Sequence, residues 1–278
     1  MFTLNCKGKL LSLEKPVVMG ILNATPDSFY EGHLDKSLSG ILHIAENMIA
    51  AGAGIIDVGG QSTRPGSQRI DADEELKRVL PVIESIHKNF PDSIISIDTY
   101  HSKVAQEAVH AGAHIVNDIS AGALDEQMII TVAALKNVPY ICMHMKGSPE
   151  NMQQQAVYED LVKEVLDFFI NKTEECRLSG INDVIIDPGF GFAKTIDHNF
   201  NLLKNLRVFE MLDRPILAGL SRKATVYKTL GITAAEALNG TTVLNTIALM
   251  NGANILRVHD VKEAREAVEL VKVFNKSG

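Results

Sequence analysis

Charged and amide side chains recur in this sequence at places where short apolar runs end. Asp98 closes the run that begins at Ile94, and Asp187 closes the run that begins at Val184. A carboxylate at the end of a buried segment needs hydrogen-bond donors. A planar ligand with two adjacent N–H groups, such as a 2-aminopyrimidinone, supplies them in the manner of a guanidinium. For either aspartate alone, a helix cap or an ion pair with a lysine is an equally open interpretation.

Two basic clusters stand late in the chain, Ser221-Arg222-Lys223 and Arg257-Val258-His259. At the last two strands of a parallel barrel, such residues lie where phosphate is often bound. Ion pairs with helix carboxylates are the alternative, and we favour the anion site. His259 could also be a general acid or a metal ligand. No other histidine has suitable ligand spacing, so we expect His259 to hydrogen-bond an anion.

Several loops have unusual chemistry. The glycine-rich segment 189–195 superficially resembles a phosphate loop, but it lacks the glycine before Lys194, which argues against a Walker-type nucleotide site. In this segment Phe192 could cover a flat ligand, whereas core packing is equally open for Phe190. Met143 and His144 end an earlier apolar run and could line a pocket. The segments 25–29 and 62–66 combine hydroxyls, prolines and turn formers, which favours lids over a binding site.

These side chains need a scaffold that brings strand ends together. Strand-like runs begin near eight positions, and each interval leaves room for a helix: Val17, Ile55, Ile94, Ile115, Tyr140, Val184, Pro215 and Ile255. Helical periodicity is present at 38–49, 158–178 and 261–275. Eight strand–helix repeats without a linker predict a single (β/α)8 TIM barrel domain over 1–278, preceded by a short hairpin at 2–14. A doubly wound open sheet is the competing fold, and the repeat count opposes it.

Composition narrows the possible partners. The chain has 278 residues, 46% of them hydrophobic, and a formal net charge of −7. That charge argues against a broad nucleic-acid or anionic membrane surface. The sequence contains no apolar run of about 18 residues and does not open on a signal peptide. Three cysteines without metal-ligand spacing are read as reduced thiols, so we expect a cytoplasmic protein.

Seven segments in register resemble dihydropteroate synthases, and the resemblance covers essentially the whole chain. They are Met19–Phe29, Asp57–Gly66, Asn117–Ser120, Met143–Lys146, Asp187–Phe192, Gly219–Lys223 and Arg257–Val261. The resemblance implies a transferase of folate biosynthesis that joins 6-hydroxymethyl-7,8-dihydropterin diphosphate to p-aminobenzoate. It also implies Mg²⁺ as a cofactor, sulfonamides as competitive inhibitors and a homodimer. In this family the diphosphate is thought to leave first, so that catalysis depends on electrostatics and positioning.

The resemblance also implies roles for individual residues. Pterin binding falls to Asp98, Asn117, Asp187 and Lys223, and diphosphate binding falls to Asn23, Thr63, Arg257 and His259, with Asn23 at the metal. Catalysis would rest on Asp98, Asp187, Lys223 and Arg257. The p-aminobenzoate site would be formed by Thr25, Pro26, Phe29, Arg64, Pro65, Phe192 and Ser221. On this division, we expect Arg257→Ala to weaken diphosphate recognition and to leave the binding of free pterin nearly intact.

The sequence departs from the family pattern at a few positions. Gln61 stands where glutamate is usual, His33 where a second glycine is usual, and Ala24 and Ala224 where valine and serine are common. None of these residues is assigned to pterin or diphosphate. Two alternative functions stay open. A methyltetrahydrofolate-binding methyltransferase shares the barrel but needs no diphosphate site, and a degenerate homologue would bind pterin without turnover.

Overall fold

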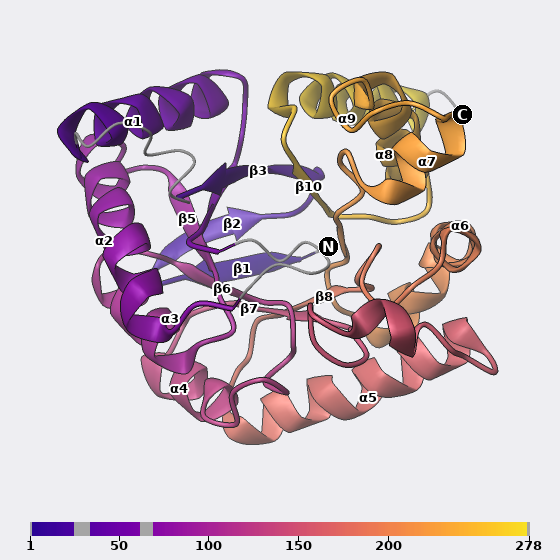
Figure 1. Cartoon of the computed structure of the whole chain (residues 1–278), viewed down its shortest axis with the longest axis horizontal. Helices are drawn as coiled ribbons and strands as arrows, with labels where there is room; N and C mark the ends of the chain where they lie inside the picture. Colours follow the sequence, from indigo (N-terminus) through magenta and orange to yellow (C-terminus); the bar gives the residue numbers. More distant parts are fainter. Residues whose placement is uncertain (1, 25–33, 62–68, 277–278) are drawn as a thin grey trace.

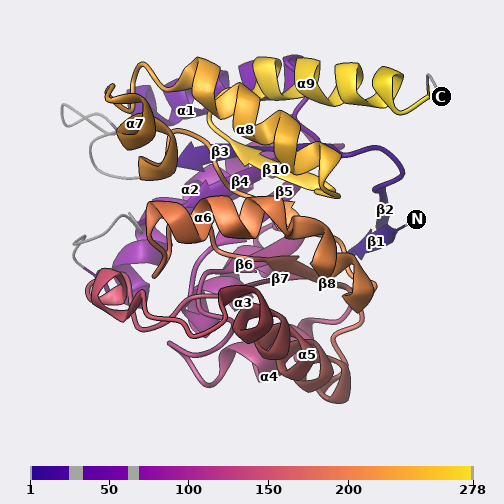
Figure 2. The ribbon, with the colours of Figure 1, turned by 90° about the vertical axis from the view of Figure 1, so that its right-hand side faces the viewer.

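The computed structural model describes residues 2–24, 34–61 and 69–276. A ring of helices surrounds a central parallel sheet, and a two-stranded hairpin lies at one end (Figures 1 and 2). The hairpin consists of β1 (Thr3–Cys6) and β2 (Lys9–Ser12), which pair antiparallel. The predicted hairpin at 2–14 is thereby confirmed.

Eight parallel strands form the sheet in the order β8-β7-β6-β5-β4-β3-β10-β9. A parallel bridge between Ile186 and Ile216 joins the two outer strands, so the sheet closes into a barrel. The strands are β3 (Val17–Asn23), β4 (Ile55–Gly59), β5 (Ile94–Asp98), β6 (Ile115–Asp118), β7 (Tyr140–Met143), β8 (Val184–Asp187), β9 (Leu217–Ala218) and β10 (Ile255–Val258). The predicted barrel is confirmed, and only the seventh strand begins later than predicted, at Leu217 instead of Pro215.

Helices follow the strands and cover the outside of the barrel (Figure 1). They are α1 (Leu34–Ala50), α2 (Ala72–Asn89), α3 (Ser102–His110), α4 (Met128–Leu135), α5 (Leu161–Ser179), α6 (Ile196–Lys204), α7 (Ala224–Leu230), α8 (Leu238–Met250) and α9 (Val261–Phe274), with 3₁₀ turns η2 (Met152–Gln155) and η3 (Leu206–Leu212). Capping residues define the ends of several of these helices. Asp71 caps α2 by accepting the Glu74 N–H at 2.8 Å, and Gly180 ends α5 in the left-handed conformation. None of the helices in the described ranges is long and apolar enough to cross a membrane.

The barrel has an apolar interior layer near its amino end. Each strand contributes one buried residue to this layer, which contains Met19, Ile55, Ile94, Ile115, Ile141, Ile185, Leu217 and Ile255. Leu4, Cys6 and Leu13 of the hairpin segment pack against the same layer. The hairpin therefore closes the amino end of the barrel, which leaves the carboxyl end for the site. Cys142 and Cys176 are also buried, in the larger core between the barrel and the helices.

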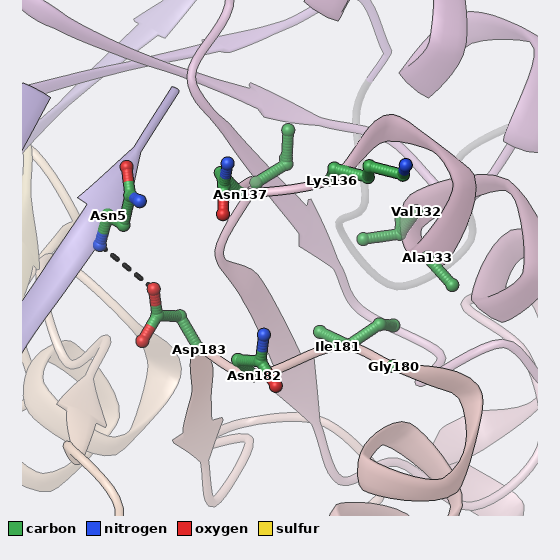
Figure 3. Close-up of a pocket in the computed structure, with 10 residues that line it drawn as sticks. Asn5, Val132, Ala133, Lys136, Asn137, Gly180, Ile181, Asn182 and Asp183 are labelled. Atoms are coloured by element: carbon green, nitrogen blue, oxygen red, sulfur yellow. Dashed lines mark hydrogen bonds between the residues drawn. The ribbon is translucent and has the colours of Figure 1, made fainter. Parts of the chain in front are cut away.

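A cavity of about 230 Å³ lies at the amino end, between the hairpin and the segments that precede β7 and β8 (Figure 3). In Figure 3, the backbone N–H of Asn5 donates to the Asp183 carboxylate at 2.8 Å. Lys7 also ties the hairpin to the barrel, because its N–H donates to the carbonyl of Asn137 at 2.8 Å. The polar groups here hold the hairpin in place. Among the residues that the structure describes, none of those predicted to bind a ligand lines this cavity.

Candidate active site

Strand alternation places a polar layer directly above the apolar one. In a strand, residues two apart face the same side. Two positions after the inward residues Ile55, Ile115, Ile185 and Ile255 come the polar residues Asp57, Asn117, Asp187 and Arg257. The sequence therefore stacks polar side chains, three of them ionisable, inside the barrel at the carboxyl ends of its strands, which is where barrel enzymes hold their substrates.

Arg257 is the centre of the polar layer. Its Nε donates to Asp57 Oδ2 at 2.6 Å, and its terminal NH2 group donates to Asp98 Oδ2 at 2.5 Å. Asn117 donates to the same Asp57 oxygen at 3.1 Å. Burial disfavours the charge of Arg257, but Asp57 and Asp98 more than offset this effect and raise its pKa. The guanidinium thus holds two carboxylates from neighbouring strands, a pairing that was not part of the diphosphate-binding and catalytic roles assigned to Arg257 from the sequence.

Two carboxylates in this layer are buried at high cost to their charge, and one of them has an oxygen that lacks a donor. Asp57 is fully buried, and its Oδ1 has no hydrogen-bond partner among the described residues. Burial raises the pKa of Asp98 to about 7, and Arg257 opposes that rise. Asp118, next to Asn117, provides a contrast, because it accepts from Ser120, Gly122 and Tyr140. The satisfied Asp118 is structural, whereas Asp57 has an oxygen that can still accept from a ligand.

Asp187 and Lys223 form the second charged group of the site. Asp187 is 6% exposed, and its Oδ1 accepts the Gly189 N–H at 2.8 Å. Burial raises the pKa of Asp187, and Lys223 is the largest effect that opposes this rise. Burial also lowers the pKa of Lys223 to about 8, with Asp187 acting in the opposite direction. The Lys223 ammonium donates to the Phe190 carbonyl and lies 4.8 Å from the centre of the Phe192 ring.

An apolar cluster accompanies these charges. It consists of the buried Tyr100, Ile119 and Met143, with Leu124, Met145 and Phe192 packed against it. Phe192 therefore contacts both the apolar cluster and Lys223. Phe190 is fully buried and belongs to the main core, so the packing interpretation is correct for its ring. A flat, polar-edged ligand would match a site that combines an apolar cluster with buried carboxylates and an ammonium.

The residues after β9 and β10 divide into two groups. Ser221 Oγ accepts the backbone N–H of His259 at 3.1 Å and lies 3.0 Å from its Nδ1, so these two predicted residues are brought together. Arg222 instead pairs with both oxygens of Asp260 at 2.8 Å and donates to the carbonyls of Ala234 and Ala235. For Arg222 the ion-pair interpretation is therefore correct, and the anion-binding prediction rests on Arg257 and His259.

Asn23 ends β3 and stands opposite Gly59 of β4, the residue that is also opposite Asp98 of β5. This register places Asn23 at the same edge of the barrel as Asp98. Within the described ranges, no group of three His, Cys, Asp or Glu residues could hold a metal.

Some of the predicted site residues lie outside the described residues. They are Thr25, Pro26, Phe29, Thr63, Arg64 and Pro65, and the same holds for the departure at His33.

Sequence reasoning missed Asp57 as a site residue. Asp57 entered the sequence analysis only as the first residue of the segment Asp57–Gly66 and was given no role. The available signal was the alternation, because Asp57 follows the apolar Ile55 by two positions, as Asp187 follows Ile185. Sequence reasoning also missed Tyr100 and Ile119, whose contribution depends on contacts between separate loops. Gln61 lies beside this region, where its Oε1 accepts from the Tyr100 hydroxyl at 3.0 Å.

Comparison of the sequence with known proteins identifies a family with matching members. The model of the pterin-binding enzyme family matches residues 19–259. The dihydropteroate synthase of Escherichia coli (strain K12) is 44% identical over 268 residues, which cover 96% of this chain and 94% of that protein. The enzyme of Haemophilus influenzae is 40% identical, with 96% of this chain and 97% of that protein covered.

Solved structures agree with these sequence matches. The dihydropteroate synthase of Yersinia pestis in complex with a sulfonamide drug superposes with a TM-score of 0.92 at 41% identity, and covers 99% of this chain and 100% of that one. The enzyme of Xanthomonas albilineans with 4-aminobenzoic acid gives a TM-score of 0.92 at 35% identity, with 99% of each chain covered. By sequence and by fold, the chain belongs to the dihydropteroate synthase family.

Proposed function

We propose that this chain is a transferase of folate biosynthesis that joins 6-hydroxymethyl-7,8-dihydropterin diphosphate to p-aminobenzoate. The products are 7,8-dihydropteroate and diphosphate. The observation that carries this proposal is the polar layer of Asp57, Asp98, Asn117, Asp187 and Arg257 inside a barrel of this family. The reaction breaks one C–O bond, with the electron pair leaving on the diphosphate. It then forms one C–N bond from the arylamine, which loses a proton.

The buried carboxylates suit the pterin. Asp187 would accept the two N–H groups of the aminopyrimidinone edge, as a carboxylate accepts a guanidinium. Asn117 and Asp98 would bind the remaining polar edge, and Lys223 would donate to the ring carbonyl or N5. Asp98 and Asp187 would also stabilise the positive charge that develops on the pterin methylene when the diphosphate leaves. In this mechanism the protein supplies position and electrostatics and does not need a strong base.

The remaining groups are assigned to the diphosphate and the arylamine. His259 and Arg257, together with Thr63, would bind the diphosphate. Phe192 and Ser221, with Thr25, Pro26, Phe29, Arg64 and Pro65, would surround p-aminobenzoate. A single amide at Asn23 fits Mg²⁺, which often takes one or two protein oxygens and completes its shell with substrate phosphates and water. When bound, Mg²⁺ would neutralise charge on the diphosphate and make it a better leaving group.

One assay tests the proposal. Purified protein is incubated with the pterin diphosphate, p-aminobenzoate and Mg²⁺, and dihydropteroate is measured, with p-aminobenzoate omitted as the control. We expect product, and we expect sulfonamides to compete with p-aminobenzoate, since the Yersinia pestis relative binds such a drug. If no product forms although calorimetry detects normal pterin binding, the degenerate-homologue interpretation is correct. Methyl transfer from methyltetrahydrofolate would indicate the methyltransferase.

We also propose a homodimer that forms through α8. Val243, Ile247 and Met250 of α8 are exposed apolar residues spaced four and three apart, so they share one helix face. Ile247→Glu is expected to give a monomer in size-exclusion chromatography with light scattering. Ile130→Glu changes an exposed isoleucine on α4, far round the barrel, and should leave the dimer intact (Figure 1). A monomeric unsubstituted protein would contradict the proposal.

We further propose that residues 1–278 form one domain in the cytoplasm. β10 pairs with β3, so segments from both ends of the chain share one sheet. The three cysteines are free and buried, in keeping with a reducing compartment. A single cooperative transition in calorimetry would agree with one domain, and fractionation of the source cells would test the location.

A further inference from the structure

Lys194 is a buried ammonium that the proposed chemistry does not use. It lies in the loop between β8 and α6, and it is 3% exposed. Its Nζ donates to His144 Nδ1 at 3.0 Å, to the His144 carbonyl at 3.3 Å and to the Phe192 carbonyl at 3.0 Å. A lysine ammonium has three donors, and three acceptors are present here. A buried cation with this set of bonds holds separate pieces of backbone together.

The partner of Lys194 is a neutral histidine. His144 is 3% exposed, and its ring meets Phe168 edge to face with 4.9 Å between ring centres. Burial lowers the pKa of His144 to about 2, so its ring is neutral. Because an ammonium can only donate, the contact of Lys194 with Nδ1 places the proton of the ring on Nε2. Burial also lowers the pKa of Lys194 to about 7, and Asp187 opposes that shift.

The loop that Lys194 ties down approaches the end of β7 closely. Gly189 has a φ of +72°, and a Cβ at this position would collide with the carbonyl oxygen of His144. The Tyr158 hydroxyl donates to the Ala193 carbonyl at 3.0 Å, which fixes the same loop from another side. Tyr158 also lies near the His144 ring, with 6.1 Å between ring centres, but the lysine hydrogen-bonds directly to the histidine Nδ1 and to the Phe192 carbonyl.

The position of this loop determines where two site residues lie. The Phe190 carbonyl accepts a hydrogen bond from Lys223, and the Phe192 ring lies over the same ammonium. A contiguous set of contacts therefore runs from Lys194 through the Phe192 backbone to Lys223. A shift of about 1 Å in such a group can cost roughly 100-fold in rate.

We propose that Lys194 is a positioning residue, which ties the loop 189–194 to the end of β7 through His144 and thereby sets the positions of Phe192 and Lys223 around the pterin. The inference rests on the proposed function. Lys194 itself does not touch the substrate, and its effect passes through the loop. A role confined to stability would lower the melting temperature of a variant without changing its kinetics, so kinetics and stability must be measured together.

The central test compares two lysine variants. Lys194→Met removes the buried ammonium, and Lys204→Met is the matched control on the exposed end of α6. We expect kcat/KM for the pterin diphosphate to fall by on the order of 10- to 100-fold in Lys194→Met and to stay unchanged in the control. A Lys194→Met protein that folds and retains kcat/KM within about twofold overturns the inference.

His144 provides a rescue test. His144→Asn retains an acceptor oxygen near the position of Nδ1, whereas His144→Leu removes it. The asparagine variant should retain most of the activity, and the leucine variant should resemble Lys194→Met. In the double variant Lys194→Met/His144→Leu, the two losses should not add, because both remove the same contact. Equal activity of the asparagine and leucine variants, or fully additive losses, would contradict the inference.

The unsubstituted protein supplies a measurement that does not depend on folding of a variant. Nitrogen-15 NMR of labelled histidines at pH 6, below the pKa of Lys194 of about 7, should show His144 with a bare Nδ1 and a protonated Nε2. The ammonium can only donate at this pH, so a proton on Nδ1 would overturn the inference. If the unsubstituted protein makes no dihydropteroate, the proposed function fails. The inference would then be tested by calorimetry with pteroic acid, in which Lys194→Met should bind more weakly than Lys204→Met. Equal affinities of the two variants would overturn it.

Discussion

Asp183 immediately precedes strand β8 and Asp187 ends it, and the two aspartates differ in what surrounds them. At the amino end, Asp183 is partly exposed and accepts the Asn5 backbone N–H, which fastens the hairpin (Figure 3). At the carboxyl end, Asp187 is buried, and the cations Lys223, Arg257 and Lys194 all act to lower its pKa. The first aspartate serves the fold. The second concentrates buried charge, which is costly unless a ligand or cation compensates it.

The same contrast holds for the two ends of the whole barrel. The amino end is filled by an apolar layer and closed by a hairpin whose polar groups bond to the backbone. The carboxyl end holds buried side-chain atoms without partners among the described residues, including Asp57 Oδ1, Gln61 Nε2 and Glu75 Oε1. Stability and binding are therefore separated along the barrel axis. Substitutions at the two ends should affect different measurements.

Asp187→Asn should have the largest effect on activity. The substitution replaces one acceptor oxygen by a donor that faces the N–H groups of the pterin, so a buried polar group is left unpaired. We expect kcat/KM to fall by roughly 1,000-fold or more, while the melting temperature stays the same or rises because a buried charge is removed. Steady-state kinetics and thermal unfolding provide the comparison. Retention of pterin affinity would remove Asp187 from the site.

Arg257→Ala should have the next largest effect. Its removal leaves Asp57 and Asp98 without their cation, and Asp57 also orients Asn117. The geometry therefore predicts a loss of both pterin and diphosphate binding, on the order of 100-fold each, in place of the selective loss expected from the sequence. Calorimetry with pterin and with diphosphate separates the two. Normal pterin binding would show that the pairing with the carboxylates is unimportant for the site.

Glu75→Gln should change how stability depends on pH. Glu75 of α2 is fully buried, one oxygen accepts from Thr99 at 2.8 Å, and burial raises its pKa to about 8. The folded chain keeps this proton up to about pH 8, whereas the unfolded chain loses it near the ordinary pKa of 4.5. The free energy of unfolding therefore falls as pH rises between these values.

The variant lacks this proton, so its stability relative to the original chain should increase from pH 5 to pH 8. The expected gain is on the order of a few kcal/mol. Urea unfolding at several pH values measures this difference. Parallel stability profiles for the two proteins would mean that Glu75 is ionised in the folded state.

Asp183→Asn should have the smallest effect. The asparagine oxygen can still accept the Asn5 N–H, so only the charge of the hydrogen bond is lost. We expect a stability loss of under about 1 kcal/mol and unchanged kinetics. Asp183→Asn is the matched control for Asp187→Asn, because it makes the same substitution next to the opposite end of β8. A large loss of activity here would break the proposed separation between the two ends.

Much of the fold could be predicted because buried parallel strands appear as short apolar runs. The seventh strand was placed too early because Pro215 and Ile216 continue its apolar run, although the pairing with β10 begins only at Leu217. Strand-end polar residues could be found in the same way. The sequence could not predict which of the two rings, Phe190 or Phe192, faces the core, because loop residues follow no fixed alternation. The contact between Lys194 and His144, 50 residues apart, has no local signal in the sequence.

The reactivity of the three buried cysteines can report where and when the folded chain opens. Burial raises the pKa of Cys6 and Cys176 to about 12, and it also raises the pKa of Cys142 well above its usual range. Because thiol reagents attack the thiolate, each cysteine should react only when its surroundings open. Cys6 lies in the hairpin, whereas the other two lie in the wall and the helical layer. If the hairpin detaches before the barrel unfolds, Cys6 should be labelled before the other two cysteines. The labelling rate of Cys6 would then measure hairpin detachment separately from global unfolding.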